Sequence, residues 1–236
     1  MIKKMVKEMK RDILLCIAAA ALSVIASYAA YLWAPPEATM GDLYRILYVH
    51  APAAWVCYLA FFISLLASIM YLSKRKKGYD RIAEVSAILG LVYGAVALVS
   101  GSIWAKAAWG SYWNWDPRET TTLILWIAYM GYVSIKLSIG SIEKRAVIGA
   151  VYNILAFSTI PLSYLSIMLL PTLHPQIATP TEIFMTPPMA ATLFLSLIAA
   201  SLFFVYLLIT AFTVWSLEDR VNALIYEKGG ILTGNV

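Results

Sequence analysis

The sequence predicts an all-α integral membrane protein with six membrane-spanning helices. Of its 236 residues, 61% are apolar and only 13% are charged, and the mean hydropathy is +0.77. A soluble domain needs more charge than this to cover its surface. Six apolar runs each reach the roughly 20 residues that a helix needs to cross a bilayer, so residues 1–236 are expected to form one membrane domain. The expected limits of the spans are 13–33, 48–72, 82–104, 119–139, 147–170 and 189–215.

The first run follows a basic N-terminal arm and resembles a secretory signal at first sight. Its apolar core is about 21 residues long, which exceeds the apolar region of a signal peptide. It ends in Trp33-Ala34-Pro35-Pro36, which is unlike a small-residue cleavage site. We therefore expect a retained anchor.

Lysine and arginine are distributed very unevenly between the two sides of the predicted spans. If the N-terminus is cytoplasmic, 15 of these residues lie inside and three lie outside, namely Arg45, Lys106 and Arg118. Short loops on the cytoplasmic side carry such an excess, so both termini are expected in the cytoplasm. The net charge of +5 then reflects topology in a cytoplasmic (inner) membrane, with the lipid bilayer as surroundings and no nucleic-acid partner.

The outer connection between the third and fourth spans, 105–118, is unusually aromatic. With Trp104 it holds four of the eight tryptophans within twelve residues: Trp104, Trp109, Trp113 and Trp115. As an interfacial helix it would place Trp109, Tyr112, Trp113 and Asp116 on one face. An ordinary aromatic belt explains one or two tryptophans at a boundary but explains this density poorly. We favour a ligand platform and allow that Trp104 alone belongs to a belt.

The only two histidines are both predicted on the same side as this segment. His50 precedes Pro52 at the outer start of the second span, and His174 precedes Pro175 in a proline-rich outer loop at 171–188 that also holds Pro180. Each histidine alone is more typical of a polar anchor than of a ligand. Two neutral imidazoles can ligate one heme iron from opposite faces, whereas zinc usually needs three or four protein ligands. The pair therefore favours heme over zinc.

The fourth span begins with a strong helix-start pattern. Asp116, Pro117 and Glu119 fit the N-cap, N1 and N3 positions. Arg118 is unfavourable there, because a cation in the first turn meets the positive end of the helix dipole. Pairing with Asp116 or Glu119 would explain it, and so would a bound anion such as the heme propionates. Arg45 and Lys106 are lesser candidates for the same contact.

Several function classes lack support in the sequence. Cys16 and Cys57 both lie inside predicted spans and form no Cys-x-x-Cys motif, so they are expected to be small buried hydrophobes. No phosphate-binding Gly-rich loop occurs, so ATP would have to be used by another chain. No nucleophile lies beside a base, and we do not expect an enzyme. Glu84 and Lys136 fall near span ends, where their side chains are expected to extend to water.

Three segments resemble a known family. Trp109-Gly-Ser-Tyr-Trp113-Asn-Trp115-Asp116-Pro-Arg118 resembles the WWD signature of heme-handling membrane proteins. The segments around His50 and His174 resemble the histidine segments that flank this signature. Length and span order resemble the cytochrome c maturation protein C family, also called heme exporter protein C. Pro117 and Glu119 depart from the small and apolar residues expected there.

The resemblance implies a protein that holds heme b non-covalently at the outer membrane face. His50 and His174 would be the axial ligands, and the WWD segment would support the ring. The heme would pass to a chaperone, maturation protein E, with help from ABC-type ATPase and permease subunits and a small helper membrane protein, maturation protein D. Two alternatives remain: a b-type cytochrome subunit of a membrane quinone oxidoreductase, and a solute transporter whose tryptophans form only a belt.

Overall fold

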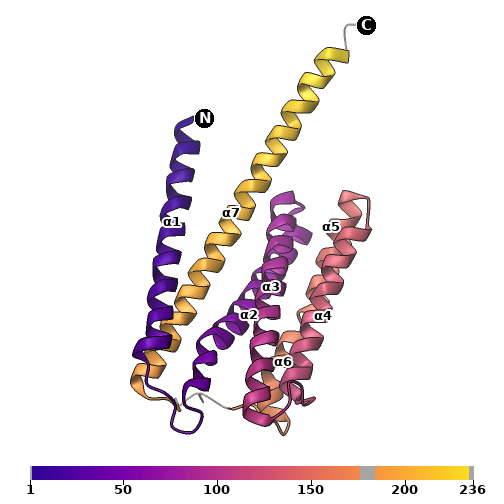
Figure 1. Cartoon of the computed structure of the whole chain (residues 1–236). Helices are drawn as coiled ribbons and strands as arrows, with labels where there is room; N and C mark the ends of the chain where they lie inside the picture. Colours follow the sequence, from indigo (N-terminus) through magenta and orange to yellow (C-terminus); the bar gives the residue numbers. More distant parts are fainter. Residues whose placement is uncertain (1, 176–183, 234–236) are drawn as a thin grey trace.

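The computed structural model describes residues 2–175 and 184–233, so part of the predicted proline-rich loop, including Pro180, lies outside the described residues. The helices follow one another in a simple order (Figure 1): α1 (Ile2–Tyr28), α2 (Leu47–Lys74), α3 (Lys77–Trp109), α4 (Pro117–Ser138), α5 (Ile142–Ala156), α6 (Thr159–Leu169) and α7 (Pro187–Thr233). A π-helical turn (Ala29–Trp33) extends α1, and a 3₁₀ turn (Asp42–Ile46) leads into α2.

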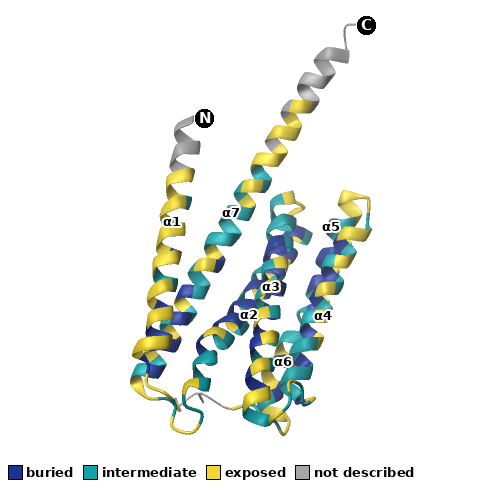
Figure 2. Ribbon diagram, in the orientation of Figure 1, coloured by how far each residue is buried: buried dark blue, intermediate teal, exposed yellow. Residues whose placement is uncertain are grey.

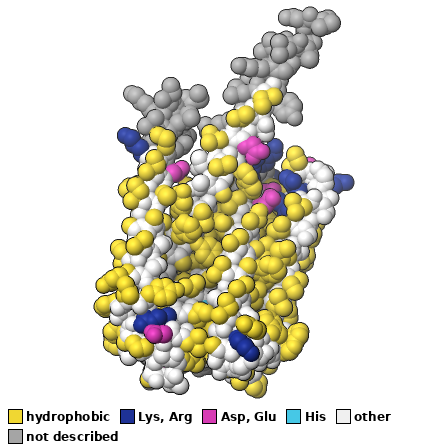
Figure 3. Space-filling view, viewed as in Figure 1, with side chains coloured by type: hydrophobic (Ala, Val, Ile, Leu, Met, Phe, Trp, Pro, Cys, Tyr) yellow, Lys and Arg dark blue, Asp and Glu magenta, His cyan; other side chains and the backbone are white. Residues whose placement is uncertain are grey.

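The prediction of an all-helical protein with six spans is confirmed. Within the described residues, six helical segments are long and apolar enough to cross a membrane, and α5 and α6 together form the fifth of them. The sides of the bundle are largely hydrophobic, and charged side chains gather toward its two ends (Figure 3). The start of α1 and the end of α7 lie at one end of the bundle, opposite the α3–α4 connection (Figure 1).

Some helices differ in extent from the spans expected from hydropathy. α3 continues beyond 104 to Trp109, and α7 continues through the expected tail to Thr233. The fifth span is broken at Phe157 and Ser158. Pro161 explains this break, because it has no N–H to donate to the Phe157 carbonyl and its ring would clash there. That carbonyl instead accepts a bond from the Ile160 N–H at 3.0 Å.

The core lies between α2, α3 and α4, where buried residues are concentrated (Figure 2). α2 and α3 form the most extensive helix pair. The Phe61 and Tyr129 rings stack with centroids 3.5 Å apart and both side chains are fully buried. α1 packs mainly against α7, at the edge of the bundle.

A polar cluster lies near the bundle end opposite the α3–α4 connection. Lys136 was expected to reach water, but its side chain is only 1% exposed. Its Nζ lies 2.6 Å from Asp80 and 3.3 Å from Glu84, which joins α4 to α3. The expectation was wrong because the helices cover the lysine, and a charge inside an apolar bundle is retained when it is paired.

Replacing this lysine is expected to destabilise the bundle strongly. Lys136→Met would leave two carboxylates without their cation, and breaking a buried pair costs about 3–5 kcal/mol. Thermal unfolding in detergent would measure the loss. Lys144→Met is the matched control, because Lys144 is exposed. Equal melting temperatures for the two variants would contradict a stabilising role for the cluster.

Candidate functional site

The aromatic segment between α3 and α4 is a loop and not the helix with an aromatic stripe that was considered above. α3 ends at Trp109 because Gly110 adopts a left-handed conformation with φ of 82°, which favours glycine and cannot continue the helix. Tyr112 and Trp113 therefore do not share a helical face with Trp109. The Trp-Gly-Ser sequence was the signal for this helix end.

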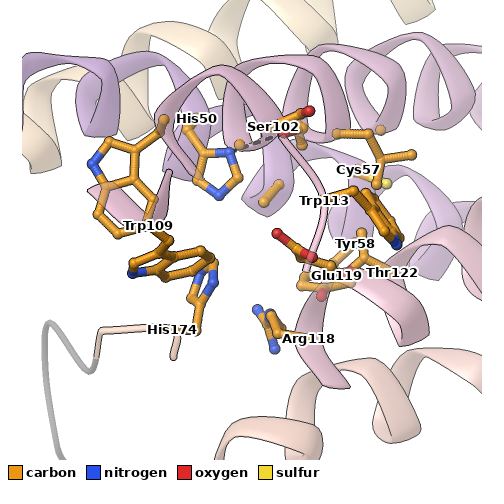
Figure 4. Close-up of a pocket in the computed structure, with 16 residues that line it drawn as sticks. His50, Cys57, Tyr58, Ser102, Trp109, Trp113, Arg118, Glu119, Thr122 and His174 are labelled. Atoms are coloured by element: carbon orange, nitrogen blue, oxygen red, sulfur yellow. Dashed lines mark hydrogen bonds between the residues drawn. The ribbon is translucent and has the colours of Figure 1, made fainter. Parts of the chain in front are cut away.

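Beside this loop, a cavity of about 640 Å³, including the space at its mouth, lies between α2, α3 and α4. Both histidines line it, together with aromatic, small and charged side chains (Figure 4). His50 projects from the first turn of α2, and His174 lies in the loop after α6.

The two imidazoles have the spacing of two ligands of one metal ion. Their ring centroids are 6.1 Å apart and their planes are tilted by 47°. Imidazoles that share an ion through bonds of about 2.0 Å place their centroids about 6 Å apart. Within the described residues, no group of three or more His, Cys, Asp or Glu side chains could hold a metal ion. The donor set is thus a pair of imidazoles, which fits heme iron.

The protonation state of each imidazole is also suited to binding a metal ion. His50 Nδ1 lies 3.0 Å from the Ala97 carbonyl, and a bond there leaves Nε2 as an acceptor. His174 Nδ1 is buried and has no partner among the described residues. Burial, with the nearby His50 and Arg118, lowers the pKa of His174 to about 4. His174 is therefore neutral near pH 7, which is the form that binds metals.

The tryptophans divide into those that face the cavity and those that do not. Trp104 and Trp109 contact the His174 ring edge-on, with centroid distances of 6.4 and 6.3 Å, and Trp113 also lines the cavity. Trp115 is 75% exposed and Tyr112 is 59% exposed, and neither lines it. Of the tryptophans in this segment, Trp104, Trp109 and Trp113 therefore line the cavity and Trp115 does not.

Asp116 is the predicted N-cap of α4 and accepts the Arg118 N–H at 2.9 Å. Its buried carboxylate also accepts bonds from the Thr172 hydroxyl at 2.8 Å and the Leu173 N–H at 2.7 Å. Burial alone would raise the pKa of Asp116, but these bonds hold it below the usual value. The hydroxyl oxygen of Thr172 in turn accepts a hydrogen bond from the backbone N–H of His174 at 3.0 Å. Asp116 thus fastens the loop that carries His174 to the start of α4.

The three candidate cations have different surroundings. Arg118 lines the cavity and, within the described residues, forms no ion pair with Asp116 or Glu119. Its Nη1 donates to the Ser163 carbonyl at 2.6 Å and the Tyr164 carbonyl at 3.2 Å. Arg45 and Lys106 bond to groups outside this cavity and do not line it.

Arg45 and Lys106 each donate hydrogen bonds to backbone carbonyls at the end of a helix. Arg45 donates to the Ala30 and Ala34 carbonyls, at the end of the first span, and pairs with Asp42. Lys106 donates to the Gly110 carbonyl at 2.9 Å. Both cations therefore stabilise the last carbonyls of a helix, as cations near helix C-termini do.

Several residues that line the cavity were not among the predicted site residues, and four of them bear on its geometry: Tyr58, Gly101, Trp104 and Glu119. Ala97, Gly101 and Trp104 recur at helical spacing, so they lie on one face of α3. This spacing would have indicated them as neighbours if the helix had been expected to extend to Trp109. Glu119 was expected to bond the N-cap. Its Oε2 instead accepts the Asn114 N–H at 3.0 Å, farther back in the loop. Nothing local in the sequence indicated Tyr58.

Gly101 is expected to be required for the position of His50. A Cβ at residue 101 would lie 2.8 Å from His50 Cε1, so Gly101→Ala would displace the imidazole. We expect a heme affinity at least about tenfold lower, the range seen when the support of a metal ligand is lost. Heme titration would measure it. Gly140→Ala is the control, because a Cβ there meets nothing within 4 Å.

A family model described as heme exporter protein C matches residues 3–227. Heme exporter protein C of Escherichia coli is 28% identical over 87% of this chain and 82% of that protein. Heme exporter protein C of Rhodobacter capsulatus is 31% identical over 53% of the chain, and a putative cytochrome c biosynthesis ccmC-like mitochondrial protein of Marchantia polymorpha is 30% identical over 65%. The chain spans 55% and 64% of the lengths of these last two proteins. The family match covers nearly the whole chain, which therefore belongs to the heme exporter protein C family.

Proposed function

We propose that this protein binds heme b non-covalently between His50 and His174 and presents it to an acceptor in c-type cytochrome biogenesis. The observation that carries the proposal is the 6.1 Å separation of the only two imidazoles, within a cavity walled by tryptophans. Family membership supports a role in heme delivery. The names of the relatives refer to heme export and cytochrome c biosynthesis.

The residues of the cavity would bind and orient without catalysing a reaction. His50 and His174 would hold the iron, and Trp104, Trp109 and Trp113 would contact the ring. Arg118 would bind a propionate, because its guanidinium faces the cavity without an ion-pair partner among the described residues. Heme supplies the vinyl groups through which an acceptor can attach it covalently. A surface site keeps such a ligand accessible for transfer.

The charge distribution of the sequence supports a heme site on the extracytoplasmic side of the inner membrane. Lysine and arginine are concentrated in the loops on the side opposite the tryptophan segment. We assign the acceptor as the heme chaperone maturation protein E, with ABC-type ATPase and permease subunits and the small helper membrane protein, maturation protein D, as further partners. These assignments follow from the family.

Transfer of heme to the purified acceptor would test the function. The protein is loaded with heme in detergent, mixed with the single-span chaperone, and the chaperone is assayed for covalent heme on a denaturing gel. We expect covalent heme on the chaperone and loss of the bound-heme spectrum from this protein. A protein that binds heme, keeps it, and cycles reversibly with a quinol would instead be the b-type cytochrome subunit. Absence of any heme binding would favour the transporter.

A further inference from the structure

The short helix α6 meets the rest of the bundle through serines. α6 is described throughout, and the residues that it buries are Ser163 and Ser166. Most of its large apolar side chains are exposed on the bundle, among them Leu162, Met168 and Leu169, and therefore face lipid. Lipid is as apolar as these side chains, so apolar contacts alone hold such a helix weakly. Polar contacts then decide where α6 lies.

Ser163 joins α6 to two other helices. Its Oγ lies 3.0 Å from the Tyr58 hydroxyl on α2 and 3.0 Å from the Thr122 hydroxyl on α4. A serine hydroxyl can donate one hydrogen bond and accept another, so the two contacts are compatible. The carbonyl of Ser163 also accepts a bond from Arg118 Nη1 at 2.6 Å. The Ser163 side chain is fully buried, so water does not compete for these bonds.

The three partners of Ser163 all line the cavity, whereas Ser163 itself does not. Tyr58 and Thr122 lie near each other, on the side of the cavity away from Trp109 (Figure 4). The guanidinium carbon of Arg118 lies 5.9 Å from the centre of the Tyr58 ring, so Tyr58 contacts both Ser163 and Arg118. One buried residue outside the cavity thus contacts side chains of α2 and α4 that form its wall.

We propose that Ser163 is a positioning residue, whose hydroxyl fixes α6 against α2 and α4 and thereby sets the position of the loop that carries His174. This role rests on the proposed function, in which His174 holds the iron. His174 follows the last residue of α6, Leu169, by five positions, so a shift of α6 moves the imidazole. Asp116 fastens the loop itself to α4, and Ser163 fastens the helix from which the loop starts.

Removal of the hydroxyl tests this role. Ser163→Ala takes away one oxygen and no carbon, so it breaks the bonds to Tyr58 and Thr122 with little change in packing. Ser166→Ala is the matched control, because Ser166 is also buried on α6 but its hydroxyl donates within the helix, to the Ser163 carbonyl at 2.8 Å. Each variant is purified in detergent and titrated with heme by visible absorption. Hydrogen exchange of the α6 backbone amides is measured by mass spectrometry in the ligand-free protein.

We expect Ser163→Ala to bind heme about three- to tenfold more weakly, the range for lost hydrogen bonds between membrane helices. It should also show a high-spin fraction that free imidazole returns to low spin, because the His174 imidazole has moved. Its α6 amides should exchange at least about threefold faster, and Ser166→Ala should match the parent in all three readouts. Adding Tyr58→Phe should weaken binding little further, because both changes remove the same bond.

Parent-like affinity and exchange in Ser163→Ala would overturn the proposal, and so would equal changes in Ser166→Ala. A parent protein that binds no heme would instead refute the proposed function. The exchange rates of α6 in the ligand-free variants would then decide by themselves whether Ser163 holds this helix in place, which separates the two failures.

Discussion

His174→Ala is expected to abolish the low-spin heme spectrum and to lower heme affinity by more than about tenfold, since even indirect supports of a metal ligand contribute that much. The imidazole of His174 faces that of His50 at 6.1 Å, and the chain has no third histidine that could replace either of them. His50→Ala should behave in the same way. Visible absorption of the detergent-purified protein, titrated with heme, provides the measurement.

Two controls separate ligation from a structural effect. Free imidazole should restore the low-spin spectrum of His174→Ala, because it can fill the position of the missing side chain. Trp115→Ala should keep the parent spectrum, because Trp115 is 75% exposed and does not line the cavity. A parent-like spectrum in both histidine variants would contradict bis-histidine binding.

The second large effect is expected at a residue that does not line the cavity. Asp116→Ala removes the acceptor of the Thr172 hydroxyl and of the Leu173 and Arg118 N–H groups. The loop that carries His174 then loses its attachment to α4, and we expect heme affinity to fall by about 10–100-fold. Loss of the N-cap should also lower stability by about 1 kcal/mol. Heme titration and thermal unfolding measure the two effects.

Three comparisons define the role of Asp116. Asp116→Asn should retain part of the affinity, because its carbonyl oxygen can still accept one or two of the bonds. Thr172→Val should weaken binding less than Asp116→Ala, because the Leu173 and Arg118 bonds remain. Free imidazole should restore the low-spin spectrum of Asp116→Ala if the loop has moved. Parent-like affinity in Asp116→Ala, or unfolding without rescue, would show that Asp116 does not position His174.

Much of the fold could be predicted because hydropathy along the chain is a local property. Six spans followed from apolar runs, and the start of α4 followed from Asp116 and Pro117. The break at Pro161 was also present in the sequence, but a continuous apolar run concealed it. The burial of Lys136 could not be predicted, because its partners on α3 are brought to it only by helix packing.

The site could be predicted in its residue types but not in its geometry. The two histidines and the tryptophan segment stood out by their number and position. Which aromatic rings face the cavity depends on the loop after Gly110, where Trp115 adopts φ of 57° and points away. The contact of His174 with His50, and the attachment of its loop by Asp116, join segments far apart in the chain. No local pattern encodes these contacts.

The pairing of Lys136 also bears on how the chain enters the membrane during synthesis. α4 has the lowest mean hydropathy of the six spans, 1.2 against 1.6 to 2.5 for the others. A lysine adds an insertion cost of about 2.5–3.5 kcal/mol at the centre of a helix, and less near its end. α3 leaves the ribosome first, so Asp80 and Glu84 are present when α4 follows. α3 and α4 are then best inserted as a hairpin, and Lys136→Met should make α4 insert more readily while the finished bundle is weakened.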